Sequence, residues 1–216
     1  MSGAPRRSRL LLLGVIAAAL IAASIVGAIH VMTPTTAGAS LTDLRGRAVA
    51  PDAGSGLSPA LVTDMHAQAD TGTRFEVPSV GLDVPLGALD MARNTITPPG
   101  FSSAYLVRNL GVAPSASAQG TVFVAMHSLR GGGVGPGNYL IDVAKQKAKV
   151  AVGAKIDVAG VEYTITSSRA IGKGDISRDR SVWADVPGRL VVITCLQRRQ
   201  GGPSLDNLVI VATRDA

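Results

Sequence analysis

The chain has 216 residues, of which 46% are apolar and 17% are charged, and its formal net charge is +6. That length suits one domain with appendages, and the apolar content excludes an intrinsically disordered chain. Aromatic residues are too sparse, at 3 Phe, 3 Tyr and 1 Trp, for a platform that stacks single-stranded nucleic acid. A single cysteine excludes an intrachain disulfide and a Cys-rich zinc module. The lone thiol is therefore an inert buried side chain, an intermolecular partner or a reactive group.

Residues 10–29 form an uncharged apolar stretch, LLLLGVIAAALIAASIVGAI. As a helix it would span about 30 Å, the thickness of the hydrocarbon core of a bilayer. Three arginines (Arg6, Arg7 and Arg9) precede it, and the next cation is Arg45. The positive-inside rule then places the N-terminus in the cytoplasm and the rest of the chain outside. The sequence predicts a single-pass cell-membrane protein, with residues 1–9 cytoplasmic and residues 10–32 a transmembrane signal anchor.

A cleaved signal peptide is the alternative to an anchor. Residues 37–39, Ala-Gly-Ala, resemble a small-residue cleavage site. The apolar stretch is longer than the roughly 7–15 residues of a signal-peptide core, which favours the uncleaved anchor. In either case the cysteine lies outside the cytoplasm.

Residues 33–73 are rich in Thr, Ala, Gly, Ser, Pro and Asp, and they indicate an extracytoplasmic linker. A short helix is predicted within it over residues 58–68, with Pro59 at the first helical position. Residues 74–216 form the remaining domain. Its cations are scattered, which does not favour binding to nucleic acid.

Short β-branched runs bounded by Gly, Pro and Asn begin at Arg74 and predict an all-β domain. The predicted strands are Arg74–Val77, Val84–Ala88, Thr121–Met126, Lys149–Val152, Lys155–Val158, Val161–Ser167, Arg189–Cys195 and Asn207–Thr213. Alternation on both sides of Ala159-Gly160 indicates a hairpin. No strand alternates with a long helix, so a parallel Rossmann-type sheet is disfavoured. About eight short strands suit a closed or nearly closed barrel, or a sandwich.

The glycine-rich stretch at residues 131–137, GGGVGPG, invites comparison with a phosphate-binding loop. It lacks the Lys-Ser/Thr pair of a Walker motif, and we expect no helix to begin after it. We interpret it as a flexible turn beside the end of a strand, with control of access as one role open to it.

One histidine and the only cysteine each lie at the end of a strong strand. His127 follows the run TVFVAM, and Cys195 follows the run LVVIT, with Arg198 and Arg199 close behind. A thiolate, an imidazole and a guanidinium are the groups that acyl transfer requires, as nucleophile, proton carrier and stabiliser of the tetrahedral oxyanion. A nearby cation also raises the thiolate fraction of a cysteine.

A structural role for these residues remains an alternative, because free cysteine is among the most buried residue types. Under that interpretation Cys195 is a small buried hydrophobe and His127 is a hydrogen-bonded loop residue. A zinc site is less favoured, since one cysteine and one suitable histidine leave the metal short of ligands.

Two of these segments resemble the signatures of the sortases, which are membrane-anchored cysteine transpeptidases of Gram-positive bacteria. Residues 125–128, Ala-Met-His-Ser, resemble the histidine signature, and residues 190–195, LVVITC, resemble the TLxTC signature. The resemblance extends over residues 74–213. It includes the opening strand pair in 74–86, the central hairpin in 152–165 and the last strand in 206–212, in a form typical of actinobacterial class E and F sortases.

The resemblance implies a sortase-like eight-stranded β-barrel with short helices, with catalysis in residues 74–216. Such an enzyme cleaves a C-terminal sorting signal of the LPxTG type between Thr and Gly. Cys195 would form a thioacyl intermediate, and His127 would be the general acid and base. The substrates would be sorting-signal-bearing surface or pilin proteins, and a peptidoglycan precursor or another amine would accept the product. The chemistry requires no metal or organic cofactor.

The arginine is the point at which this chain departs from the family pattern. Sortases usually carry an essential arginine at the start of the final strand, where this chain has Pro203-Ser204-Leu205-Asp206-Asn207. Arg199 and Arg198 are the remaining candidates, and Arg199 is placed first because alternate residues of a continuing strand share the face of Cys195. A smaller departure is Met126 before the histidine.

Two further functions stay open beside the transpeptidase. A thiol peptidase would release the same acyl-enzyme to water. A catalytically silent, membrane-tethered barrel that binds cell-wall partners is conceivable because the arginine is displaced.

Overall fold

A computed structural model describes residues 41–49 and 58–216. The predicted cytoplasmic N-terminus, signal anchor and cleavage site lie outside these residues. Within the described ranges, no helix combines the length and the hydropathy of a membrane span.

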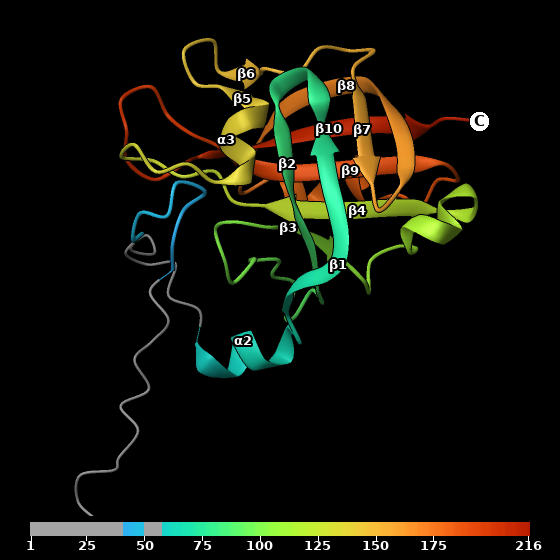
Figure 1. The fold of residues 1–216 in the computed structure, drawn as a ribbon, viewed down its shortest axis with the longest axis horizontal. Coiled ribbons are helices and arrows are strands. Elements are labelled where there is room, and N and C mark those ends of the chain that lie inside the picture. Colours follow the sequence, from blue (N-terminus) through green and yellow to red (C-terminus); the bar gives the residue numbers. More distant parts are fainter. Residues whose placement is uncertain (1–40, 50–57) are drawn as a thin grey trace, which may run out of the picture. The chain divides into compact units, whose positions relative to one another are not determined.

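Eight strands close into one barrel, and this confirms the all-β prediction (Figure 1). They are β1 (Gln68–Val77), β2 (Leu82–Leu89), β3 (Ala104–Val107), β4 (Thr121–Met126), β7 (Lys155–Val158), β8 (Val161–Gly172), β9 (Arg189–Leu196) and β10 (Asp206–Arg214). Around the barrel the order is β1-β2-β3-β4-β9-β10-β8-β7. Two neighbouring pairs, β2 with β3 and β4 with β9, are parallel, and the other pairs are antiparallel.

Alternate residues of the strands build two separate apolar clusters. In β9, Leu190 and Val192 belong to the cluster inside the barrel, which receives side chains from all eight barrel strands. Val191 belongs to a second cluster, with Ile193 packed against it. The two clusters follow from the period of two in a strand, which sends successive side chains to opposite faces. Each fully buried Val or Leu contributes about 1.5–3 kcal/mol to folding.

Short elements connect the strands. The α-helices are α2 (Pro59–Asp64), α3 (Pro136–Leu140) and α4 (Arg180–Trp183), the 3₁₀ turns are Pro78–Val80, Pro114–Gln119 and Ile176–Arg178, and β5 (Ile141–Asp142) pairs with β6 (Lys147–Ala148). The Ser58 hydroxyl accepts a hydrogen bond from the N–H of Leu61 and caps α2, so the predicted start at Pro59 is confirmed. The helix ends earlier than predicted, because β1 already begins at Gln68. β1 therefore starts inside the stretch assigned above to the linker.

Most strand predictions hold, with two differences. The predicted strand Lys149–Val152 is wrong: Lys149 donates its N–H to Leu140 at the close of the β5–β6 hairpin, and Val152 is 67% exposed in a turn. Strand β3 was not predicted, because its four residues carry no apolar–polar alternation. The predicted hairpin turn is confirmed by positive φ angles of 54° at Ala159 and 81° at Gly160.

Candidate active site

The strand register brings His127 and Cys195 to the same level of the barrel. The parallel pairing of β4 with β9 ends with Met126 beside Thr194, so His127 and Cys195 are the next residues of the two strands. On the other side of β9, Cys195 is paired with Asn207 of β10. Directly opposed residues of antiparallel strands have Cβ atoms about 4.5–5.5 Å apart. The sheet therefore aligns a histidine, a cysteine and an asparagine in one row.

These three residues contribute to one cleft of about 1350 Å³. The remaining lining comes mainly from four segments, namely residues 41–49, 94–101, 128–133 and 173–183. Cys195 and His127 are both half-buried, so the thiol and the imidazole are reached from the cleft while their strands hold them. The predicted nucleophile and the predicted proton carrier are thus brought together.

The imidazole of His127 is held from the loop between β2 and β3. Its Nε2 atom lies 2.7 Å from the carbonyl oxygen of Pro98. The ring of Phe101 meets the imidazole edge-on, with centroids 5.0 Å apart and an interplanar angle of 63°. Both contacts come from the same loop, and Phe101 is itself buried.

Hydrogen bonds also connect the segments that follow His127 and Cys195. The buried hydroxyl of Ser128 donates to the carbonyl oxygen of Cys195 at 2.5 Å. The side-chain amide of Gln197 donates to both the carbonyl and the hydroxyl oxygen of Ser128, each at 2.9 Å. These bonds fix the backbone around the thiol and explain why the sequence after His127 contains a serine.

Gly137, near the start of α3, lies directly against this pair of strand ends. Its N–H donates to the carbonyl of His127 at 2.8 Å. A Cβ added at Gly137 would lie 2.0 Å from Oγ1 of Thr194 and 2.9 Å from the carbonyl oxygen of His127. Glycine is therefore the residue that this close approach allows. The expectation that no helix begins after the glycine-rich stretch is wrong, because α3 starts at Pro136.

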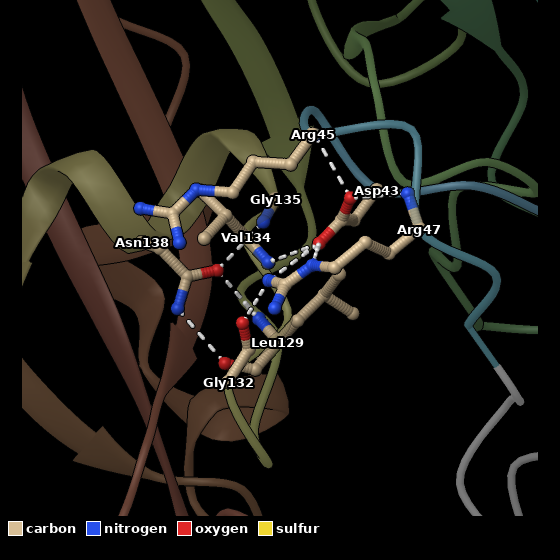
Figure 2. Close-up of polar contacts among 8 residues, drawn as sticks. All are labelled: Asp43, Arg45, Arg47, Leu129, Gly132, Val134, Gly135 and Asn138. Carbon is tan, nitrogen blue, oxygen red and sulfur yellow. Dashed lines mark hydrogen bonds and ion pairs between the residues drawn. The ribbon is translucent and has the colours of Figure 1, made fainter.

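The glycine-rich stretch is also held in place by a second segment, residues 41–49 (Figure 2). The carboxylate of Asp43, 3% exposed, accepts hydrogen bonds from the N–H groups of Arg45, Arg47 and Val134 and from the guanidinium of Arg47. Arg47 also donates to the carbonyl of Gly132. Burial alone would raise the pKa of Asp43, but these donors outweigh it and hold the pKa well below its usual range.

Asn138 fixes the other end of the same stretch. Its side-chain oxygen accepts from the N–H of Leu129 and the N–H of Gly135, at 2.7 and 2.8 Å, and its amide donates to the carbonyl of Leu129 at 2.8 Å (Figure 2). Hydrogen bonds therefore hold both ends of residues 131–137, which line part of the cleft and which the sequence analysis interpreted as a flexible turn.

The two predicted arginines are not among the described residues that line the cleft. Arg198 is half-buried and Arg199 is exposed. The cations that do line it are Arg47, Arg130 and Lys173. Arg130 was missed in the sequence, although its position three residues after His127 at a strand end was a usable signal.

In residues 41–49 and 58–216 there is no group of three or more His, Cys, Asp and Glu side chains that could hold a metal ion. His66 is exposed, and its Nδ1 atom lies 3.3 Å from the carboxylate of Asp90.

No family model matches the chain, and no curated protein matches it. Among solved structures, sortase A of Listeria monocytogenes is 22% identical and is matched over 69% of this chain and 89% of its own, with a TM-score of 0.48. A lid mutant of sortase A from Corynebacterium diphtheriae is 13% identical over 69% and 72% of the two chains, with a TM-score of 0.47. Sortase C-1 of Streptococcus pneumoniae is 15% identical over 67% and 66%, with a TM-score of 0.48. These three solved structures are sortases.

Proposed function

We propose that the chain is a cysteine transpeptidase of the sortase type. The observation that carries the proposal is the placement of the sole cysteine and of His127 at one level of two neighbouring parallel strands, both facing one cleft. The two residues lie far apart in the sequence, and in this proposal Cys195 is the nucleophile and His127 is the proton carrier. The motif resemblance supplies the substrate class, a C-terminal sorting signal of the LPxTG type.

The reaction follows from these two groups. Sγ of Cys195 attacks the carbonyl carbon of the threonine in the sorting signal, and the thiol proton passes to His127. The Thr–Gly C–N bond breaks as His127 returns that proton to the leaving amine, which leaves a thioester on Cys195. The incoming amine then attacks the thioester, its proton passes to His127, and the thiol is regenerated.

Several side chains are candidates to stabilise the tetrahedral oxyanion. Asn207 is paired with Cys195 and lines the cleft, so its side-chain amide is a donor beside the reacting carbon. Arg130 supplies a cation in the same lining. Arg199 and Arg198 remain the candidates that the sequence predicted, from the loop after β9.

We also propose where the reaction takes place and which molecules take part in it. Residues 10–32 would anchor the chain in the cell membrane with the barrel on the extracytoplasmic side. The substrates would be sorting-signal-bearing surface or pilin proteins, and the acceptor a peptidoglycan precursor or another amine.

The test uses the full chain in detergent with an LPxTG peptide, with and without a glycine-based amine. We expect mass spectrometry to detect a thioester on Cys195, and the amine to divert the product from the free acid to the amide. Cys195→Ala and His127→Gln should abolish turnover, while His66→Gln, on the exposed surface, serves as the matched control. Unchanged cleavage in both site variants would refute the proposal, and free acid alone at saturating amine would indicate a thiol peptidase.

A catalytically silent, membrane-tethered sortase-like barrel that binds cell-wall partners is the second candidate. It is favoured by the absence of both predicted arginines from the described lining of the cleft. Alkylation distinguishes the two: iodoacetamide at neutral pH should modify Cys195 readily in an active enzyme, and an unreactive thiol would support the silent barrel.

A further inference from the structure

The loop between β2 and β3 contacts His127 in a way that bears on which ring nitrogen does the chemistry. We propose that the Pro98 carbonyl and the Phe101 ring clamp the imidazole with its proton on Nε2, so that Nδ1 is the nitrogen that exchanges protons with substrate. Phe101 is then a positioning residue. The kinetic part of this proposal rests on the proposed function, whereas the protonation state of the ring does not.

The hydrogen bond between His127 and Pro98 decides which ring nitrogen carries the proton. A carbonyl oxygen only accepts, so at 2.7 Å from Pro98 the Nε2 atom of His127 must be the donor. In a neutral imidazole one nitrogen carries the proton and the other accepts, and the partner of one nitrogen decides which. The bond to Pro98 therefore leaves Nδ1 as the acceptor nitrogen.

The second step is that the carbonyl is fixed. Just ahead of Pro98 the loop forms a tight turn, in which Ala92 and Thr95 exchange hydrogen bonds of 3.1 and 2.8 Å. Pro98 is followed by a second proline, and consecutive prolines restrict the backbone to extended conformations. Gly100 then lies so close to the buried Tyr105 of β3 that an added Cβ would be 2.9 Å from the tyrosine hydroxyl oxygen.

The third step is the contact with Phe101. The centroid distance of 5.0 Å and the angle of 63° are within the range of favourable edge-to-face pairs. Rotating the imidazole by half a turn about χ2 would place a carbon, Cε1, where Nε2 now meets Pro98. The Phe101 ring, 8% exposed, lies against the imidazole and hinders that rotation.

The two nitrogens of the His127 ring therefore have different roles. Nε2 keeps its proton throughout the cycle. Nδ1 takes the thiol proton, gives it to the leaving amine as the C–N bond breaks, and accepts the proton of the incoming amine when the thioester is resolved.

The protonation state is tested by NMR on the full chain in detergent with ¹⁵N-labelled histidine. The chain has 3 histidines, so the spectrum is simple, and His127→Gln identifies the resonance of interest. Above the pH at which the ring is charged, we expect His127 to carry its proton on Nε2. A proton on Nδ1, or rapid exchange between the two tautomers, would overturn the proposal. This result is independent of whether the chain cleaves a peptide.

The positioning role is tested by turnover of the LPxTG peptide. Phe101→Leu should lower kcat by about 10- to 100-fold with little change in KM, since a misplaced proton carrier slows chemistry more than binding. Gly100→Ala should act in the same direction by displacing the loop, and Phe101→Tyr should retain most of the turnover. Phe75→Leu, inside the barrel and outside the described cleft lining, is the matched control for lost packing.

Two outcomes would overturn the positioning role. One is a kcat in Phe101→Leu that falls no further than in Phe75→Leu at equal folded fraction. The other is unchanged ¹⁵N shifts and line widths for His127 in Phe101→Leu. If instead the wild-type chain shows the Nε2 proton and no turnover, the clamp holds and the proposed function fails.

Discussion

Replacing Gly137 by alanine tests whether the start of α3 is packed against the two catalytic strand ends as tightly as the structure indicates. The new Cβ would lie 2.0 Å from Oγ1 of Thr194, whereas real Cβ atoms essentially never approach closer than 3.0 Å. The groups must therefore move apart by about 1 Å. The backbone carbonyl of His127 at 2.9 Å blocks one direction of escape.

The cost follows from the packing on both sides. Thr194 is 2% exposed, and among the described residues its hydroxyl has no hydrogen-bond partner, so no bond is lost if the side chain rotates. The strain then falls on packing, and inserting a methyl group into a filled site costs about 1–3 kcal/mol. In a domain of this size each kcal/mol lowers Tm by about 2–4 °C.

The assay is urea unfolding of Gly137→Ala beside two comparisons. Gly174→Ala is the matched control, because a Cβ there meets nothing within 4 Å and its φ is ordinary. Its unfolding free energy should change by less than about 1 kcal/mol. Thr194→Ala removes the clashing oxygen, so the double variant should recover at least about 0.5 kcal/mol relative to the sum of the single changes. Additivity of the two changes, or a Gly137→Ala protein as stable as Gly174→Ala, would refute the reasoning.

Three further predictions concern charge and hydrogen bonding at the cleft. Asp43→Asn should destabilise the protein most at neutral pH. The lowered pKa of Asp43 stabilises the fold in full above the ordinary value of 3.8, and this contribution is lost as the pH falls from there through the folded pKa. The gap in urea midpoint between wild type and variant should be equal at pH 7 and pH 5 and smaller at pH 3, and a gap at pH 3 as large as that at pH 7 would contradict this. Arg130→Gln should lower kcat/KM for the sorting peptide more than Arg199→Gln does, because of these two arginines Arg130 is the one that lines the cleft. A larger loss in Arg199→Gln would place the cation that stabilises the oxyanion in the loop after β9. If the amide of Asn207 binds the oxyanion, Asn207→Ala should lower kcat by about 100-fold or more at nearly constant KM. Asn207→Asp should lose as much activity as Asn207→Ala, and full activity in either variant would exclude that role.

Most of the strands, and the meeting of His127 and Cys195, were predictable because each carries a local signal. β4 was predicted with its exact ends, since a run of six apolar or β-branched residues lies between Gly120 and His127. The cysteine drew attention by being the only one. Strand β3 has four residues and no alternation, so its place in the barrel is decided by its neighbours β2 and β4.

The walls of the cleft were not predictable from local pattern. Asp43 lies in a polar stretch that indicates a linker, yet its carboxylate bonds to the N–H of Val134, 91 positions along the chain. The partner of His127 is a backbone carbonyl, which leaves no trace in residue type. Asn207 becomes a neighbour of Cys195 only through the register of β9 with β10, which the sequence does not state.

The parallel pairing of β4 with β9 has a consequence for how the protein acquires its chemistry. Ser128 and Cys195 are 67 positions apart, and β7 and β8 lie between β4 and β9 in the sequence but not in the barrel. Contacts between such distant segments are slow to form, because the chain must close a large loop before it gains their energy. In the barrel, β10 lies between β9 and β8. Under the proposed function, a partly folded chain would hold Cys195 without His127 beside it, and reactivity of the thiol would appear only when β4 and β9 have paired.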